Sequence, residues 1–210
     1  MATAEDVQQQ ATSLQPHDEE SILMFNLCKQ GSVTCSTAPA DMFDGAREVY
    51  EWPVVSSADK EILISRVEGI IDGDGDAHEF LRQRAALVMD EMLENALYCA
   101  PRDANGKQLY SKGEKRSLCP GEKIMLRCAY DGEKLLLEVS DNWGKLSPET
   151  VQGFITLNLE PNDSDDRAGR GLYLMWKFMK DFYVKHAPDI KTSVGGYLLL
   201  DHASHEYGTV

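Results

Sequence analysis

A long amphipathic segment, residues 79–100, sets the strongest constraint on how this chain can fold. Pro101 follows the segment directly and ends it, because proline has no backbone N–H to continue the helical hydrogen bonds. On a helical wheel of about 100° per residue, the apolar side chains fall on one stripe. The stripe consists of Leu81, Ala85, Val88, Met89, Met92 and Ala96. We therefore predict a long helix whose stripe faces the core.

Strands are expected before and after this helix, each marked by a short apolar run. Asp131-Gly132 separates two of these runs and is typical of a β-hairpin. The expected strands are residues 47–55, 124–130, 135–140, 182–184 and 197–200, and the expected shorter helices are residues 57–71 and 172–180. Residues 101–122 are rich in turn-forming residues and read as an irregular insertion.

The length of 210 residues suits one domain with extensions. We place this domain at residues 46–202, with a flexible or accessory segment at residues 1–45 and a tail at residues 203–210. Residues 1–20 are rich in Gln, Ala and acidic residues without apolar periodicity and read as a flexible tail. Residues 21–40 fit either a short helix or a strand, which would serve as an added strand or as an arm that binds a partner.

Composition and charge narrow the function classes. The net charge of -14 argues against a nucleic-acid reader, because affinity for phosphate backbones comes largely from Lys and Arg. An acidic body also repels a nucleotide triphosphate, so a site for one must supply local backbone donors, a helix N-terminus or a cation. The five cysteines include no C-x-x-C pair and fit reduced thiols. With no signal sequence and no apolar run of about 20 residues, we expect a cytoplasmic protein without membrane partners.

Glu91 and Asn95 lie one turn apart on the predicted helix, at the edge of its apolar stripe. Asp90 and Glu94 fall on the opposite side, which we expect to be solvated. A carboxylate that borders a core is costly unless it is paired or has a chemical task. Glu91 is therefore the better candidate for chemistry, although a helix-edge carboxylate that its neighbours satisfy also fits the spacing.

Two glycine-bearing loops contain further candidates. Asp141 ends a predicted strand, where a carboxylate can accept a hydrogen bond from an exocyclic amine or simply begin a turn. Gly169-Arg170-Gly171-Leu172 opens a predicted helix. Glycines at a helix start let backbone N–H groups approach a phosphate, and the helix dipole there favours anions. An ordinary loop-to-helix turn has the same pattern.

The order of these features resembles the N, G1 and G2 boxes of the GHKL ATPases, the superfamily of gyrase, histidine kinases, the mismatch-repair ATPases and a heat-shock chaperone. The resemblance covers residues 49–201. It implies an α+β fold, a two-layer α/β sandwich in which helices cover one face of a mixed, mostly antiparallel sheet. It also implies that the chain binds ATP and Mg²⁺.

Carried over position by position, the resemblance makes Asn95 the side-chain ligand of Mg²⁺ and Glu91 the general base. Asp141 becomes the partner of the adenine amino group, with Gly144 in the same loop. The phosphate-facing loop implied by the resemblance consists of Gly169, Arg170, Gly171 and Leu172, and the implied ATP lid spans residues 147–167.

One part of the chain departs from the family pattern. The usual first loop reads Asp-x-Gly-x-Gly, and here Trp143 and Lys145 occupy the glycine positions. Trp143 either packs against the base, which preserves ATP binding, or fills part of the adenine pocket, which leaves a degenerate module.

Within the superfamily the chain is most similar to the anti-sigma serine/threonine kinases, because it combines Glu91, a compact domain and a short lid ending in Gly-Arg-Gly-Leu. This similarity implies an ATP-Mg²⁺-dependent protein kinase that phosphorylates a small anti-sigma-antagonist (STAS-like) protein in a partner-switching pathway. A sigma factor and a second copy of the chain are further implied partners. Two alternatives stay open: a nucleotide-sensing protein-binding module without transfer activity, and an ATPase without a protein acceptor.

Overall fold

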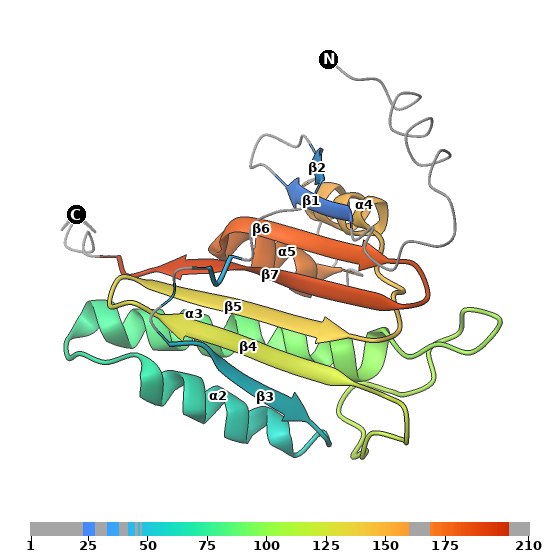
Figure 1. Cartoon of the computed structure of the whole chain (residues 1–210), viewed down its shortest axis with the longest axis horizontal. Coiled ribbons are helices and arrows are strands. Elements are labelled where there is room, and N and C mark those ends of the chain that lie inside the picture. Colours follow the sequence, from blue (N-terminus) through green and yellow to red (C-terminus); the bar gives the residue numbers. More distant parts are fainter. Residues whose placement is uncertain are drawn as a thin grey trace, which may run out of the picture.

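The computed structural model describes residues 23–27, 33–37, 42–44, 46, 48–159 and 169–201 (Figure 1). The strands are β1 (Leu23–Leu27), β2 (Val33–Thr37), β3 (Tyr50–Val54), β4 (Ile124–Tyr130), β5 (Lys134–Asp141), β6 (Lys180–Ala187) and β7 (Lys191–Leu199). The helices are α2 (Asp59–Ile70), α3 (Asp76–Glu94), α4 (Pro148–Leu159) and α5 (Arg170–Phe178). A π-helical turn, η1 (Asn95–Cys99), continues α3.

The strands form one sheet in the order β2-β1-β6-β7-β5-β4-β3. The predicted hairpin is confirmed, since β4 pairs with β5 on either side of Asp131-Gly132. Every pairing between the described strands is antiparallel, so the expectation of a mixed sheet is wrong for them. The reason lies in the connections: β6 and β7 are joined by a short turn, and β7 then lies against β5 in the opposite direction.

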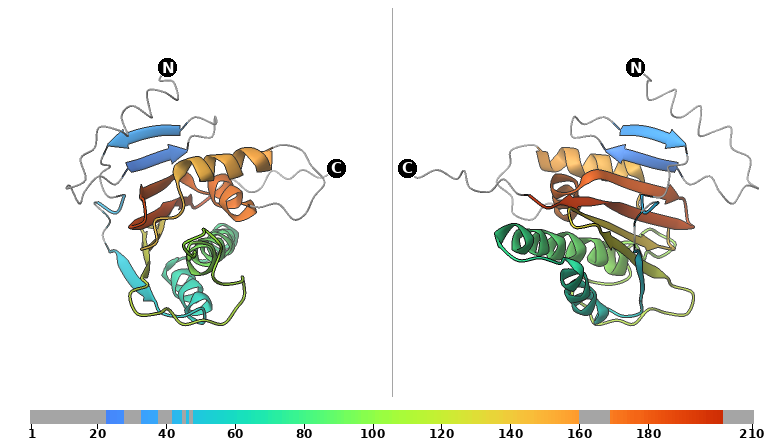
Figure 2. Two further views of the ribbon diagram at one scale, coloured as in Figure 1. Left: turned by 90° about the vertical axis from the view of Figure 1, so that its right-hand side faces the viewer. Right: turned by 60° about the vertical axis from the view of Figure 1, so that its left-hand side comes forward.

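The helices lie on one face of this sheet, so that the domain has two layers (Figure 2). Helix α3 contacts β5 and β7, while α2 and α5 pack against α3. Helix α4 contacts α5 and β6. At this level the α+β, two-layer expectation is confirmed.

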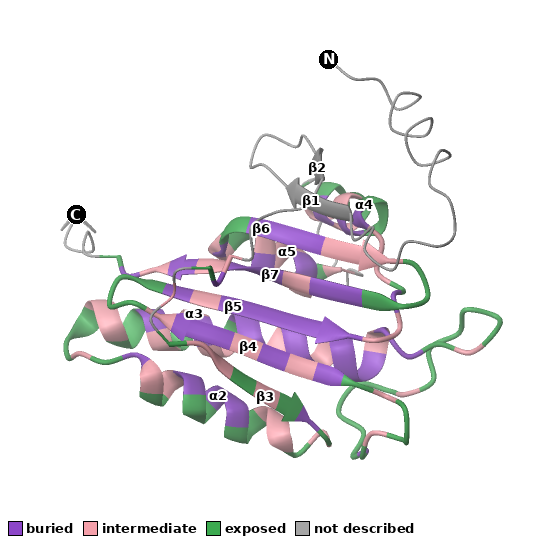
Figure 3. Ribbon diagram, viewed as in Figure 1, coloured by how far each residue is buried: buried purple, intermediate pink, exposed green. Residues whose placement is uncertain are grey.

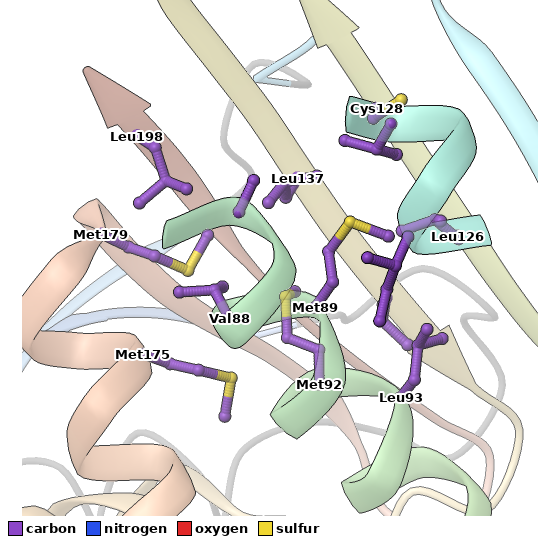
Figure 4. Close-up of a cluster of buried hydrophobic side chains, with 14 of the residues drawn as sticks. Val88, Met89, Met92, Leu93, Leu126, Cys128, Leu137, Met175, Met179 and Leu198 are labelled. Carbon is purple, nitrogen blue, oxygen red and sulfur yellow. The ribbon is translucent and has the colours of Figure 1, made fainter. Parts of the chain in front are cut away.

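The core lies between α3 and the sheet. The predicted stripe, which runs along α3 and into η1, is buried as expected, with each of its six side chains at most 4% exposed. Met89 and Met92 of α3 lie among Leu126 and Leu137 of the sheet and Met175 of α5 (Figure 4). Strand β5 is buried along nearly its whole length, because it has a neighbouring strand on each side (Figure 3).

Several element boundaries differ from those predicted. Strand β7 begins at Lys191 and not at residue 197, because β5 and β6 pair with its first half although Gly195 and Gly196 weaken its own strand propensity. Helix α4 forms within the segment expected to be the lid. Its first turn is capped by Ser147, whose Oγ accepts the backbone N–H of Thr150 at 3.2 Å.

The insertion at residues 101–122 is irregular, as predicted, and Arg116 anchors it. The Arg116 guanidinium donates to the backbone carbonyl of Leu97 at 2.7 Å, pairs with Glu122 and lies 3.7 Å from the centre of the Tyr110 ring. Leu97 belongs to the π-helical turn. Arg116 therefore bonds a carbonyl in the stretch where regular α-helical hydrogen bonding is interrupted.

Strands β1 and β2 fall within residues 21–40, so the strand alternative holds there and the added strand β1 extends the sheet beside β6. Phe43 packs on the sheet, with the Arg127 guanidinium 4.3 Å from its ring centre. The predicted tails at residues 1–20 and 203–210 and the lid residues 160–167 lie outside the described residues. None of the described helices has the length and apolar character needed to cross a membrane.

Candidate functional site

The candidate site lies where the end of α3 meets the start of α5. Helices α3 and α5 are in contact, and this contact brings Glu91 against Gly171. A Cβ on Gly171 would overlap the Oε2 atom of Glu91 and would lie 2.7 Å from its Cδ. Only glycine fits at this position without displacing the Glu91 carboxylate.

The glycine-bearing segment positions the N-terminus of α5. Gly169 precedes the helix with φ of 78°, in the left-handed region that glycine adopts readily. A Cβ there would also overlap Phe154 of α4. Arg170, the first residue of the helix, is exposed, and Leu172 is buried and fixes the helix in the core. The first turn of α5 is thereby held beside Glu91, and helix N-termini of this kind attract anions.

Asn95 begins the π-helical turn, and its backbone carbonyl accepts the N–H of Ala100 at 2.9 Å. The Nδ2 atom of Asn95 is buried and has no hydrogen-bond partner in the structure. A buried amide without a partner is unfavourable, and the π-helical widening occurs often at functional sites. An amide turned about χ2 presents its oxygen at the same place. Asn95 is therefore the side chain of this site that most needs a ligand.

The acidic residues beside Glu91 are arranged differently from the prediction. Glu94 is not solvated: its side chain is 19% exposed, close to the 21% of Glu91. Lys112 approaches Glu94 at 3.0 Å and Glu91 at 3.8 Å, while Lys60 bonds Asp90 at 2.6 Å and Glu94 at 3.2 Å. The expectation of a solvated side chain is wrong for Glu94, because Lys60 of α2 and Lys112 of the insertion cover it, whereas the Asp90 side chain is 37% exposed.

These lysines also set the ionisation of Glu94. Burial raises the pKa of the Glu94 carboxyl, but the hydrogen bonds from Lys112 and Lys60 outweigh it, so that the pKa lies below its usual value. Glu94 is a satisfied, ionised structural carboxylate. Glu91 has a longer contact with Lys112 and faces Gly171, which leaves it the better placed of the two for chemistry.

Asp141 ends β5 and is 8% exposed. Burial raises the pKa of its carboxyl to about 6, although its Oδ1 accepts the backbone N–H groups of Trp143 at 2.9 Å and Gly144 at 3.3 Å. Thr192 lies directly opposite Asp141 on β7, and its buried Oγ1 has no hydrogen-bond partner in the structure. The backbone of Thr192 also donates a hydrogen bond to Asp141, so in this pair of buried polar residues it is the Thr192 hydroxyl that lacks a partner.

The sequence reasoning missed Thr192. A single threonine in a strand of small residues gives no local signal, and only the antiparallel register of β5 and β7 places it opposite Asp141. That register becomes visible once β7 is known to begin at Lys191.

Gly144 has a structural task in this loop. Its φ is 59°, and a Cβ there would overlap the backbone of the turn between β6 and β7. Its carbonyl accepts the backbone N–H of Asp189 at 3.2 Å, and His186 Nε2 lies 3.0 Å from the same oxygen. Lys145 pairs with Asp189, and Trp143 packs at the edge of the core. The two residues that depart from the family pattern are therefore built into the fold of the loop.

The predicted site residues lie in two places: at the junction of α3 and α5, and at the end of β5. Glu91 and Gly171 are in contact at the junction of α3 and α5, and Asn95 lies one helical turn after Glu91, at the start of η1. The turn η1 contacts β5, the strand that Asp141 ends. The C-terminal ends of α3 and β5 both lie toward the right-hand side of Figure 1. Among the residues described, no three or more His, Cys, Asp or Glu side chains are grouped so as to hold a metal ion.

No protein-family model matches this chain, and no curated protein matches it in sequence.

Proposed function

We propose that this chain binds ATP with Mg²⁺ and transfers the γ-phosphoryl group to a serine or threonine of a protein partner. The observation that carries the proposal is the contact between Glu91 and Gly171, because it sets a carboxylate beside the helix N-terminus that would receive phosphates. In phosphoryl transfer, the protein mainly positions the reactants and neutralises charge.

Asn95 is the residue that would hold Mg²⁺, through its side-chain oxygen. The fit rests on its buried amide, which lacks a partner, and on the preference of Mg²⁺ for oxygen ligands. Such an ion keeps several waters and is usually completed by substrate phosphates, so a single protein side chain suffices. When bound, it would supply neutralisation of the phosphate charge.

Glu91 would act on the acceptor hydroxyl. The hydroxyl oxygen forms the new bond to the γ-phosphorus, the bond to the β–γ bridging oxygen breaks, ADP leaves, and the hydroxyl proton goes to the Glu91 carboxylate. The amides at Gly169, Arg170 and Gly171 would hold the phosphates, with the help of the dipole of α5.

Asp141 would select adenine by accepting a hydrogen bond from the exocyclic amine. The support is its buried position and its pairing with Thr192, whose free hydroxyl offers a second hydrogen bond to the base. A buried carboxylate with a raised pKa is costly to the fold, and such groups cluster at functional sites.

The proposed partners follow from the resemblance to the anti-sigma kinases. They are a small anti-sigma-antagonist (STAS-like) protein as phosphate acceptor, a sigma factor, and a second copy of the chain. The net charge of -14 supports protein partners over nucleic acid.

A second candidate function is a nucleotide-sensing module without transfer. The observation that favours it is the position of Trp143, which packs at the core beside Asp141 in place of a glycine. A side chain at that position can fill part of an adenine pocket. An ATPase without a protein acceptor is the remaining alternative.

A titration that measures ATP binding with and without Mg²⁺ tests whether the residues of this site bind nucleotide or only stabilise the fold. Binding that requires Mg²⁺ and depends on Asn95 supports the nucleotide site. Radiolabelled γ-phosphate then distinguishes transfer to a partner, release as inorganic phosphate, and binding alone. Absence of nucleotide binding in the folded protein would refute the proposal.

A further inference from the structure

We propose that Lys112 is a further nucleotide-binding residue, whose ammonium group contacts the triphosphate when nucleotide enters the site. The inference rests on the proposed function. It assigns a role to the insertion at residues 101–122, to which the family resemblance assigns none.

The contacts of Lys112 place it beside the proposed phosphate loop. Its Nζ lies 3.8 Å from Oε2 of Glu91 and 3.0 Å from Oε2 of Glu94. The same Oε2 atom of Glu91 is the one that lies against Gly171 at the start of α5. A cation, the proposed base and the helix N-terminus therefore meet within the reach of one lysine side chain.

The backbone that carries Lys112 is held in place on both sides. Tyr110 lies under the guanidinium of the buried Arg116, and Tyr98 of η1 donates a hydrogen bond to the carbonyl of Glu114 at 2.8 Å. Ser111 and Glu114 close a turn around Lys112 with two further hydrogen bonds of 3.1 Å. The insertion thus fixes where Lys112 is attached, while its long side chain keeps freedom to move.

Lys112 can leave its ion pairs with Glu91 and Glu94 at little cost. Its side chain is 50% exposed, and ion pairs with such exposure contribute little to stability. Glu94 also keeps a second cation, because Lys60 lies 3.2 Å away and is only 19% exposed. If Lys112 turns toward a phosphate, Glu94 stays paired and only Glu91 loses its ammonium neighbour.

A triphosphate is the ligand chemistry that this arrangement fits. The acidic body repels nucleotide, and the amides of α5 supply only partial charges, so the site needs a full positive charge close to it. The several charges of a triphosphate compete for the ammonium with two carboxylates, Glu94 at 3.0 Å and Glu91 at 3.8 Å, and both of these ion pairs are half-exposed on the lysine side. Moving Lys112 to the phosphates also leaves the Glu91 carboxylate free to accept a proton.

Titrations of Lys112→Met, Lys112→Arg and Lys115→Met with ATP and with adenosine, in the presence of Mg²⁺, test the inference. Lys115 is the matched control, because it is an exposed lysine of the same insertion. Calorimetry follows ATP, ligand-observed NMR follows the weaker adenosine, and circular dichroism checks that each variant is folded. We expect Lys112→Met to lose about tenfold to a hundredfold in ATP affinity, with unchanged affinity for adenosine, which lacks phosphates. Lys112→Arg should keep most of the affinity, and Lys115→Met should match the wild type.

Two results would overturn the inference alone while the wild type still binds ATP. One is wild-type ATP affinity in Lys112→Met, and the other is an equal loss for ATP and adenosine, which would make Lys112 a structural residue. A folded wild type that binds no nucleotide would overturn the proposed function, and this inference with it.

Discussion

The carboxylate of Glu91 occupies the space that a Cβ atom on Gly171 would need, so the two residues proposed to act on the same phosphate are in contact across α3 and α5. This contact makes the two positions dependent on each other. A side chain at residue 171 requires Glu91 to move, and a change at Glu91 makes room at residue 171.

Gly171→Ala should destabilise the wild type by about 1 kcal/mol, at the low end for overpacking, because the atoms it meets are the end of the flexible Glu91 side chain. In a Glu91→Ala background the same substitution should be neutral or stabilising, because alanine is intrinsically better than glycine in a helix. Denaturant unfolding of the four proteins gives the coupling directly. An equal cost in both backgrounds would show that the two residues do not interact.

Gly153→Ala is the control for this pair. Gly153 lies in α4, is exposed, and has no heavy atom within 4 Å of its hypothetical Cβ. The substitution should stabilise the protein by about 0.5 to 1 kcal/mol. A loss of stability in Gly171→Ala and a gain in Gly153→Ala would show that crowding against Glu91, and not helix propensity, determines the effect at residue 171.

Asn95→Ala should weaken ATP binding mainly when Mg²⁺ is present, because the lost ligand acts through the metal. The measurement is the ATP dissociation constant in Mg²⁺ and in EDTA for wild type and variant. An equal loss in EDTA would instead assign Asn95 a structural role in the π-helical turn.

Asp141→Asn should raise stability at neutral pH. The pKa of this carboxyl is 3.8 when unperturbed and about 6 in the fold, so the folded state binds the proton more tightly than the unfolded chain. Ionised Asp141 therefore costs stability progressively as the pH rises from about 4 to 6. About two pKa units at 1.36 kcal/mol each gives a cost on the order of 2 to 3 kcal/mol at pH 7.

Unfolding free energies of wild type and Asp141→Asn at pH 4 and pH 7 test this, and the advantage of the variant should grow toward pH 7. Asp189→Asn is the control. A hydrogen bond from Lys145 lowers the pKa of the Asp189 carboxyl below 3.8, so its contribution is almost complete by pH 4 and the effect of this variant should hardly change between pH 4 and pH 7. A pH-independent difference for Asp141→Asn would mean that burial does not raise the pKa of the Asp141 carboxyl.

The same Asp141→Asn protein should bind ATP less selectively over GTP, because the acceptor that faces the exocyclic amine of adenine is replaced by an amide. Competition between the two nucleotides for the variant gives the ratio of affinities. Unchanged selectivity in this folded variant would remove Asp141 from the adenine site.

Arg116→Met should destabilise the protein by about 3 to 5 kcal/mol, because it leaves Glu122 without its buried partner and the carbonyl of Leu97 without its donor. Arg102→Met is the control, since Arg102 makes an exposed hydrogen bond to Gly106 within the same insertion. Thermal unfolding of both variants should show a large loss for Arg116 alone. Similar small losses would mean that Arg116 does not anchor the insertion.

The sequence predicted the parts of the fold that local periodicity controls. The stripe of α3 and the hairpin of β4 and β5 follow from repeating apolar positions and from Asp131-Gly132, and both are present. The full length of β7 was missed, since its pairing partners and not its own residues make it a strand. Helix α4 was missed because the resemblance assigned its segment to a lid, although Ser147 and Pro148 form a typical helix start.

The site residues, too, divide into those that the local sequence predicts and those that only the fold reveals. Glu91, Asn95 and Asp141 could be proposed from their spacing and context, because each lies at the edge or end of a predictable element. Thr192 could not be found, and Glu94 was misjudged, because their surroundings come from distant segments.

The central claim is that Glu91 is the base of a phosphoryl transfer, and the most direct measurement is γ-phosphate transfer to a purified antagonist-like partner by wild type and Glu91→Ala. Asp90→Asn is the control, because Asp90 is the neighbouring carboxylate and pairs with Lys60. We predict that Glu91→Ala keeps ATP affinity within several-fold, since a base acts in the transition state, while transfer falls by about 10² to 10⁴ and Asp90→Asn stays active. A wild type that binds ATP but labels no partner and releases no phosphate would contradict the claim and leave the nucleotide-gated binding module in its place.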